Sequence, residues 1–303
     1  MSWTAGCRWR VWAPVLAGCV VALGFSGHLV TGTAHAEAPV AAPGIPDWGP
    51  ILKPAAPQGL SPIALAQQMR AAIENVSPGT NPGIEVVDTA TGTELASLNA
   101  DSQFYTASVV KLLIAIDAAD GQGGDPDPAT AGQIRQMLSA SDDSVADVLW
   151  DADGGDAIID RMTALIGLPG TQPPDDPDQW GETRTTPRDI VTIYHYLTTA
   201  APQPERDLVL GALGSINEVA ADGTDQYFGI PAALPGTDWA VKPGWMSLDS
   251  STTLNTTGLV GSTAEPLRYA VVILTSQPAG ISWTTGGAAL TAGVGVLRTT
   301  LGL

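Results

Sequence analysis

Basic residues are scarce in this sequence of 303 residues. It has 13 lysines and arginines against 31 aspartates and glutamates, which gives a formal net charge of −18 at pH 7. A surface this acidic repels phosphate backbones, so we expect no nucleic-acid partner. Only three of the cations are lysines, Lys53, Lys111 and Lys242. Because Lys111 stands in an apolar segment of so acidic a chain, it is a poor candidate for a side chain that merely reaches into solvent.

Cysteine is rarer still, with Cys7 and Cys19 alone, both near the start of the chain. There, two arginines precede an apolar run that ends at the small residues around Ala36, which is the pattern of a signal peptide. We expect residues 1–36 to be removed, leaving a secreted, extracytoplasmic protein without disulfides. The alternative is a membrane tether, because the residues before Cys19 resemble a bacterial lipobox, or because the leader stays uncleaved.

The order of helices and strands predicts the fold class. A proline- and alanine-rich linker over residues 37–60 precedes a domain over residues 61–303. Its ends carry the strands and the terminal helices, and its middle, from about 120 to 215, is all helical. We therefore expect an α+β fold, in which a five-stranded antiparallel sheet is flanked by the terminal helices and carries an inserted helical lobe. The expected elements are helices over 61–75, 104–119 and 284–299, and strands over 83–88, 94–98, 239–242, 251–260 and 268–274.

Ser108 and Lys111 are the first candidate catalytic residues. They stand three apart at the predicted start of an apolar helix, so both side chains lie on one face. A serine there has free backbone N–H groups beside it, and a lysine in a dry pocket can lose its proton and take the one from the serine. The alternative interpretation is that Ser108 caps a core helix and Lys111 extends to solvent.

Three short motifs then follow one another along the chain. They are Ser108-Val109-Val110-Lys111, Ser141-Asp142-Asp143 and Lys242-Pro243-Gly244. In this order they resemble the S-x-x-K, S-D-N and K-T-G motifs of the serine β-lactamases and penicillin-binding D-alanyl transpeptidases, and the class A branch most closely. The resemblance covers residues 61–303 and implies the fold and the serine hydrolase chemistry of that superfamily.

The resemblance also implies a role for each motif residue. Ser108 would be the nucleophile, and Ser141 would relay a proton to the leaving nitrogen. Lys242 would attract a substrate carboxylate across the cleft, and the N–H groups of Ser108 and Trp245 would form the oxyanion hole. In the alternative interpretations, Ser141 is an ordinary helix cap and Lys242 is a surface charge. Substrate contacts would come from Asp143, Gly244 and Trp245.

Several departures from the family pattern bear on the reaction. A carboxylate at Asp143 replaces an amide that could donate a hydrogen bond, and Pro243 replaces a hydroxyl that helps to hold the substrate carboxylate. The E-x-x-L-N segment that supplies the water-activating glutamate of class A enzymes is missing. Acylation without efficient deacylation is therefore expected, unless an aspartate of the following loop takes over: Asp175, Asp176 or Asp178.

The sequence thus predicts an exported serine acyl-hydrolase or acyl-transferase. It would form an acyl-enzyme on Ser108 with a β-lactam or a D-alanyl, peptidoglycan-derived peptide, as a monomer and without cofactor or metal. One alternative is a competent class A-type β-lactamase. The other is a non-catalytic protein of the same fold that binds cell-wall fragments. We expect His195 to be a packed core histidine, and residues 151–156 to be a solvated loop instead of a calcium site.

Overall fold

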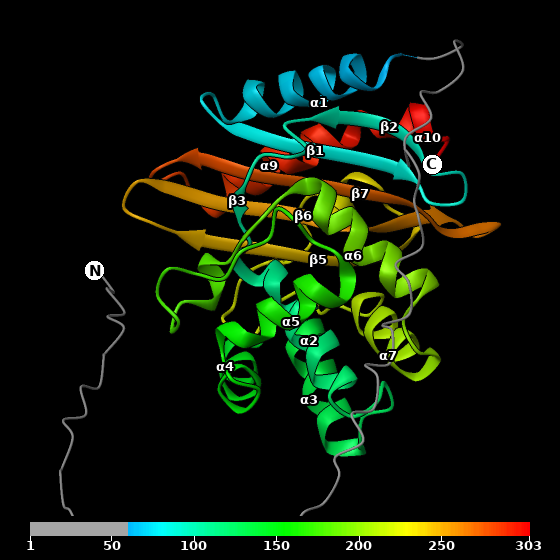
Figure 1. Ribbon diagram of the computed structural model, residues 1–303. Coiled ribbons are helices and arrows are strands. Elements are labelled where there is room, and N and C mark those ends of the chain that lie inside the picture. Colours follow the sequence, from blue (N-terminus) through cyan, green and yellow to red (C-terminus); the bar gives the residue numbers. More distant parts are fainter. Residues whose placement is uncertain (1–59) are drawn as a thin grey trace, which may run out of the picture. The chain divides into compact units, whose positions relative to one another are not determined.

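The computed structural model describes residues 60–303. The predicted cleavage after Ala36, the alternative anchor at Cys19 and nearly all of the linker lie outside the described residues. Within these residues, the chain forms one large sheet and a set of helices that pack on its two faces (Figure 1).

The sheet confirms the predicted fold class. Its five strands lie in the order β2-β1-β7-β6-β5, and every neighbouring pair is antiparallel. Because β5 stands at one end of this order, one of its edges has no sheet partner and can face the helical lobe. The strands are β1 (Asn81–Asp88), β2 (Thr93–Leu98), β5 (Asp238–Ser247), β6 (Ser251–Ser262) and β7 (Glu265–Pro278).

Helices from the two ends of the domain pack together on one face of the sheet. They are α1 (Pro62–Val76) and α9 (Trp283–Gly295), followed by the short α10 (Leu297–Leu301). Their apolar sides share one core with the strands, including Met69 and Leu290. The two helices approach closely, since a Cβ at Gly293 would lie only 2.7 Å from Ile73 Cγ1. The prediction that terminal helices flank the sheet is therefore correct.

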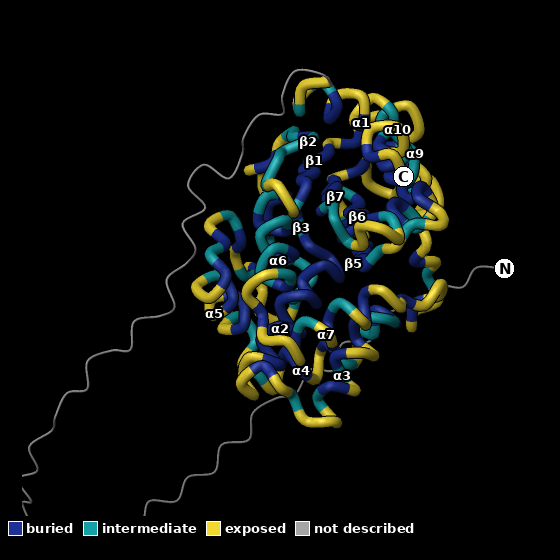
Figure 2. Tube along the Cα trace, turned by 90° about the vertical axis from the view of Figure 1, so that its right-hand side faces the viewer, coloured by how far each residue is buried: buried dark blue, intermediate teal, exposed yellow. Residues whose placement is uncertain are grey.

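The other face is covered by the helical part of the chain. At its centre lies α2 (Lys111–Asp120), which is buried at every position from 111 to 119 and contacts the helices around it (Figure 2). Apart from Lys111, Asp117 and Asp120 its residues are apolar, and a helix that is apolar on most sides is buried by its neighbours. The surrounding helices are α3 (Pro128–Ser139), α4 (Asp143–Ala152), α5 (Asp156–Ile166), α6 (Pro187–Thr199) and α7 (Gln203–Leu213).

The region before α2 differs from the prediction of one continuous helix over 104–119. Phe104–Tyr105 is a short strand, β3, that pairs with β4 (Arg184–Thr185), and Ala107–Val110 is a 3-10 turn. The physical reason is the backbone of Ala107, whose φ of +45° is incompatible with a right-handed helix running back through it. Sequence reasoning also missed the 3-10 turn Trp180–Glu182 and the short α8 (Ile230–Ala233).

Candidate active site

Ser108 lies in the 3-10 turn that leads into α2, and strand β5 holds it from the other side. Its side chain is nearly inaccessible, with 5% of the residue exposed. A Cβ on Gly244 would lie 3.1 Å from Ser108 N and 2.8 Å from Thr106 O, so only a glycine lets the strand come this close. The positive φ of Ala107, one residue before, is a strained conformation of the kind that collects at functional sites.

Lys111 is fully buried at the first turn of α2, with its amine directed at the other motif residues. Its Nζ lies 3.0 Å from Ser108 Oγ and 2.8 Å from the carbonyl oxygen of Ser141. It also donates to Asp143 Oδ1. The alternative interpretation, in which Lys111 extends to solvent, is therefore wrong, and the amine is within hydrogen-bonding reach of the serine hydroxyl.

Two opposing influences set the pKa of Lys111. Burial is the larger one and lowers the pKa below the ordinary lysine value, because a charged amine is poorly solvated there. The Asp143 carboxylate opposes this effect by attraction and hydrogen bonding, and the more distant Asp142 and Asp222 oppose it weakly. The net direction is downward, which favours the neutral amine that a base requires.

Ser141 is placed by the residue that follows it. Asp142, not Ser141, caps α4, since its side chain accepts hydrogen bonds from the N–H groups of Ser144 and Val145. Ser141 precedes the cap with a φ of +51° and is 4% exposed. Its hydroxyl accepts a hydrogen bond from Lys242 Nζ at 2.9 Å and lies 3.4 Å from Lys111 Nζ. The helix-cap interpretation of Ser141 is thus wrong, and its hydroxyl bridges the two lysines.

Lys242 reaches the same point from the opposite wall, on β5. It is completely buried, so it is not the surface charge of the alternative interpretation. Besides Ser141 Oγ, its amine donates to the carbonyl oxygen of Pro243 at 3.0 Å. Burial, and then repulsion from the charge of Lys111, lower the pKa of Lys242 well below its ordinary value.

Gly244 and Trp245 continue β5 past the serine. At the edge of the sheet that has no strand partner, Gly244 lies against the main-chain nitrogen of Ser108. The Trp245 residue is 9% exposed and its Nε1 donates to Asp222 Oδ2 at 2.9 Å. Its ring centroid lies 5.9 Å from Lys242 Nζ. The oxyanion hole formed by the N–H groups of Ser108 and Trp245 stays a prediction.

Asp143 has a partner that sequence reasoning did not predict. Instead of standing free to meet a substrate, its carboxylate pairs with Lys111, while 61% of its side chain stays exposed. The amide that the family pattern has at this place could not form an ion pair. A substrate contact by Asp143 stays a prediction, and its contact with Lys111 is the finding.

A tryptophan that sequence reasoning missed covers the same amine. The ring of Trp180 lies 4.8 Å from Lys111 Nζ, and its Nε1 donates to Asp147 Oδ1 at 2.8 Å. A second hydrogen bond joins α4 to the loop before this tryptophan, because Trp150 of α4 donates its Nε1–H to the carbonyl oxygen of Pro177. The only signal in the sequence was the position of Trp180 beside a proline- and aspartate-rich loop.

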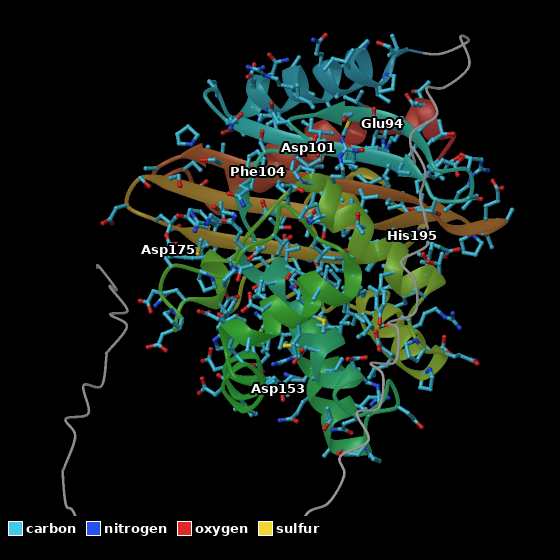
Figure 3. The ribbon with its side chains drawn as sticks, in the orientation of Figure 1. Glu94, Asp101, Phe104, Asp153, Asp175 and His195 are labelled. Atoms are coloured by element: carbon cyan, nitrogen blue, oxygen red, sulfur yellow. The ribbon has the colours of Figure 1, made fainter. Side chains whose placement is uncertain are left out.

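Two of the three loop aspartates have partners within or beside the loop. Asp175 pairs with Arg184 at 2.7 Å and Asp176 accepts from the N–H of Asp178. Figure 3 shows Asp175 at the outer edge of the loop, on the opposite side of the view from His195. His195 lies on α6, its ring contacts Thr199 Oγ1 at 2.9 Å, and burial lowers its pKa to about 4. None of these contacts reaches Ser108 or Lys111.

Comparisons with known proteins agree with this arrangement. A family model described as the beta-lactamase enzyme family matches residues 64–123 and 131–294. The Mycobacterium tuberculosis and Mycobacterium bovis proteins named "Putative lipoprotein LppW" are each 33% identical over 213 residues. The alignment covers 68% of this chain and 66%, just under two thirds, of either relative.

Solved structures share the fold at low sequence identity. An acyl-enzyme complex of a PBP-A mutant with penicillin G superposes with a TM-score of 0.63 at 18% identity, covering 78% of this chain and 95% of that one. A β-lactamase from Chitinophaga pinensis has a TM-score of 0.64 at 14% identity, covering 78% and 98%. The chain therefore belongs to the beta-lactamase enzyme family and has the fold of the serine β-lactamases and penicillin-binding proteins.

Proposed function

We propose that the protein forms an acyl-enzyme on Ser108 with a β-lactam or a D-alanyl peptide, and releases the acyl group slowly. The observation that carries this proposal is the 3.0 Å separation between Ser108 Oγ and the buried amine of Lys111. A nucleophile and a base at hydrogen-bonding distance in a water-poor site are the requirement for covalent catalysis by serine.

The reaction follows from the contacts of these groups. Ser108 Oγ attacks the carbonyl carbon while its proton passes to neutral Lys111 Nζ. The negative charge that develops on the carbonyl oxygen is stabilised by the N–H groups of Ser108 and Trp245. When the carbon–nitrogen bond breaks, the leaving nitrogen takes its proton from the Ser141 hydroxyl. Lys242 holds that hydroxyl and supplies it with a proton in turn, because its Nζ lies 2.9 Å from Ser141 Oγ.

Slow release of the acyl group rests on the carboxylates around the site. Hydrolysis of an acyl-enzyme needs a water molecule activated by a base, and the carboxylate in contact with the catalytic lysine is Asp143. Asp175 is paired with Arg184 and exposed. Neither is the buried, unpaired carboxylate that would hold a water molecule against the acyl group.

The ion pair between Lys111 and Asp143 favours a second candidate function. A carboxylate beside the lysine stabilises its charged form, in which it cannot accept the proton of Ser108. A protein that binds cell-wall fragments without turning them over needs no proton transfer to Lys111, so this ion pair would not impair it.

We further propose that the protein acts outside the cytoplasmic membrane. The name of the LppW relatives contains the word lipoprotein, which supports the alternative of a lipid on Cys19. Within residues 60–303 no helix is long and apolar enough to cross a bilayer. Metabolic labelling of the full chain with a fatty acid, compared with a Cys19→Ala variant, distinguishes the lipid anchor from signal-peptide cleavage. Loss of the label in the variant supports the anchor. An unlabelled chain that begins at residue 37 supports cleavage after Ala36.

Mass spectrometry of the intact protein, incubated with a fluorescent penicillin and sampled over time, tests the proposed function. A persistent adduct that is absent from Ser108→Ala is the expected result. Rapid consumption of the penicillin with free protein remaining would instead show an efficient β-lactamase. No adduct, with wild type and Ser108→Ala indistinguishable, would contradict the acyl-enzyme and leave the binding protein.

A further inference from the structure

A cavity of about 490 Å³ has Trp245 in its lining and none of Ser108, Lys111, Ser141 or Lys242. Its walls come from the loop between α7 and α8, from the start of α9, and from strands β5 and β6. Trp245 follows Gly244, which lies against the main-chain nitrogen of Ser108, and the Trp245 ring lines the cavity. Trp245 is thus the residue that joins the strand segment beside Ser108 to the cavity wall.

Aromatic rings form much of the lining. The Trp245 ring lies at 6.4 Å from both Phe228 and Trp283, tilted by 77° and 58° respectively. Trp283 is 40% exposed and Tyr227 is 37% exposed, although rings of this size are usually better covered. Both line the same cavity.

The charges of the lining all have one sign. Among the described residues that line the cavity there is no lysine, arginine or histidine, whereas Asp222 and Asp225 are both present. Asp222 fixes the Trp245 ring by accepting its N–H at 2.9 Å. One oxygen of Asp225 accepts the N–H of Tyr227 at 2.7 Å, which leaves the carboxylate charge at the cavity wall. The amine of Lys242, 5.9 Å from the centre of the Trp245 ring, is fully buried and outside the lining.

We propose that this cavity binds an organic cation, and that this cation is the ammonium group of the substrate that Ser108 acylates. Aromatic faces attract cations through their quadrupoles, and two carboxylates supply the opposite charge. A carboxylate at the same place would meet Asp222 and Asp225 and lose binding energy. The second half of the proposal rests on the proposed acyl-enzyme, and it implies a substrate with a free amine near the reacting carbonyl.

Binding to the cavity is tested without acylation in the full-length Ser108→Ala variant. Benzyltrimethylammonium is titrated against its neutral isostere neopentylbenzene, and binding is followed by tryptophan fluorescence and by NMR. The cation is expected to bind at least about fivefold more tightly than the isostere. Asp225→Asn should reduce that preference while its amide oxygen keeps the bond to Tyr227. Trp283→Leu should also reduce it, and Trp283→Phe should restore it in part.

Asp238→Asn is the matched control, because it removes one negative charge from the opposite end of β5, outside the cavity. Equal binding of the two probes, or equal effects of Asp225→Asn and Asp238→Asn, would overturn the cation site. Circular dichroism and thermal unfolding show whether each variant is folded before its binding is interpreted.

Acylation of the wild type tests the substrate class. Two acyl thioesters are compared that differ only in a terminal trimethylammonium or tert-butyl group. Faster acylation by the cationic thioester, lost in Asp225→Asn, is expected. Equal rates with a Ser108 adduct would overturn the link between the cavity and the substrate, while the acyl-enzyme would stand. Absence of any adduct would overturn the proposed function together with this link, and the probe titration would then decide the cation site alone.

Discussion

The active-site cleft and the helix α7 both bury ionisable groups, and they treat them in opposite ways. In the cleft, Lys111 and Lys242 are fully buried and each amine donates at least two hydrogen bonds. On α7, Glu205 is equally buried, but neither carboxylate oxygen makes a hydrogen bond of good geometry with any other residue of the 60–303 region. Burial and the charge of Asp120 raise its pKa to about 7, which the nearby Tyr196 only partly offsets.

The comparison distinguishes buried ionisable groups that serve the proposed reaction, Lys111 and Lys242, from one that the fold buries outside the active site, Glu205. Removing a charge from water is unfavourable in either place. In the cleft, hydrogen bonds and Asp143 hold the amines in one geometry, which is what a base and a proton relay need. At Glu205, Tyr196 compensates only in part, so burial raises the pKa of the carboxyl to about 7. Substitutions in the cleft should therefore change activity, and substitution of Glu205 should change the pH dependence of stability without changing activity.

The largest expected effect is that of Lys111→Met. Loss of the base should slow acylation of Ser108 about 10³-fold. The free energy of unfolding should not fall, because a buried amine is replaced by an apolar chain and Asp143 stays in contact with water. Stopped acylation reactions analysed by intact mass, and urea denaturation, give the two quantities. A Lys111→Met variant that is acylated at the wild-type rate would show that Lys111 is not the base.

Glu205→Gln should show the reverse pattern, with unchanged acylation and a gain in stability. Because the pKa of Glu205 is raised in the folded protein, its contribution to stability is complete below the ordinary glutamate value near 4.5 and is lost as the pH rises towards about 7. The gain on substitution should therefore be larger at pH 8 than at pH 5, by on the order of 2 kcal/mol. Urea denaturation at the two pH values measures it, and a gain that does not depend on pH would contradict a buried, protonated carboxylate.

Asp143→Asn is expected to change the pH dependence of acylation more than its maximal rate. Removing the carboxylate removes the attraction that raises the pKa of Lys111, so this pKa should fall further. More of the lysine is then neutral at a given pH, and the acidic limb of the acylation profile should move to lower pH. The maximal rate should stay within about tenfold of the wild type. A limb that moves to higher pH would show that Asp143 assists the proton transfer in another way.

Sequence patterns were sufficient for the sheet and for bringing together Ser108, Lys111, Ser141 and Lys242. Alternation and terminal placement of the strands specify the antiparallel sheet, and the spacing of Ser108 and Lys111 places both on one face. The positive φ of Ala107 could not be foreseen, because alanine carries no local preference for that conformation. The contacts of Lys111 with Asp143 and Trp180 join segments far apart in the chain, and they exist only once the helices have packed.

The protonation of Lys111 is the central claim, and the scarcity of lysine makes it directly measurable. With only three lysines in the chain, labelling lysine at the ε-carbon gives an NMR spectrum of at most three side-chain signals. The signal that is absent from the spectrum of Lys111→Met is that of Lys111. The account predicts that this signal titrates below the ordinary lysine value of 10.5, at the same pH as the acidic limb of the acylation rate. A Lys111 signal that titrates at or above that value, or an acylation rate indifferent to it, would contradict the account.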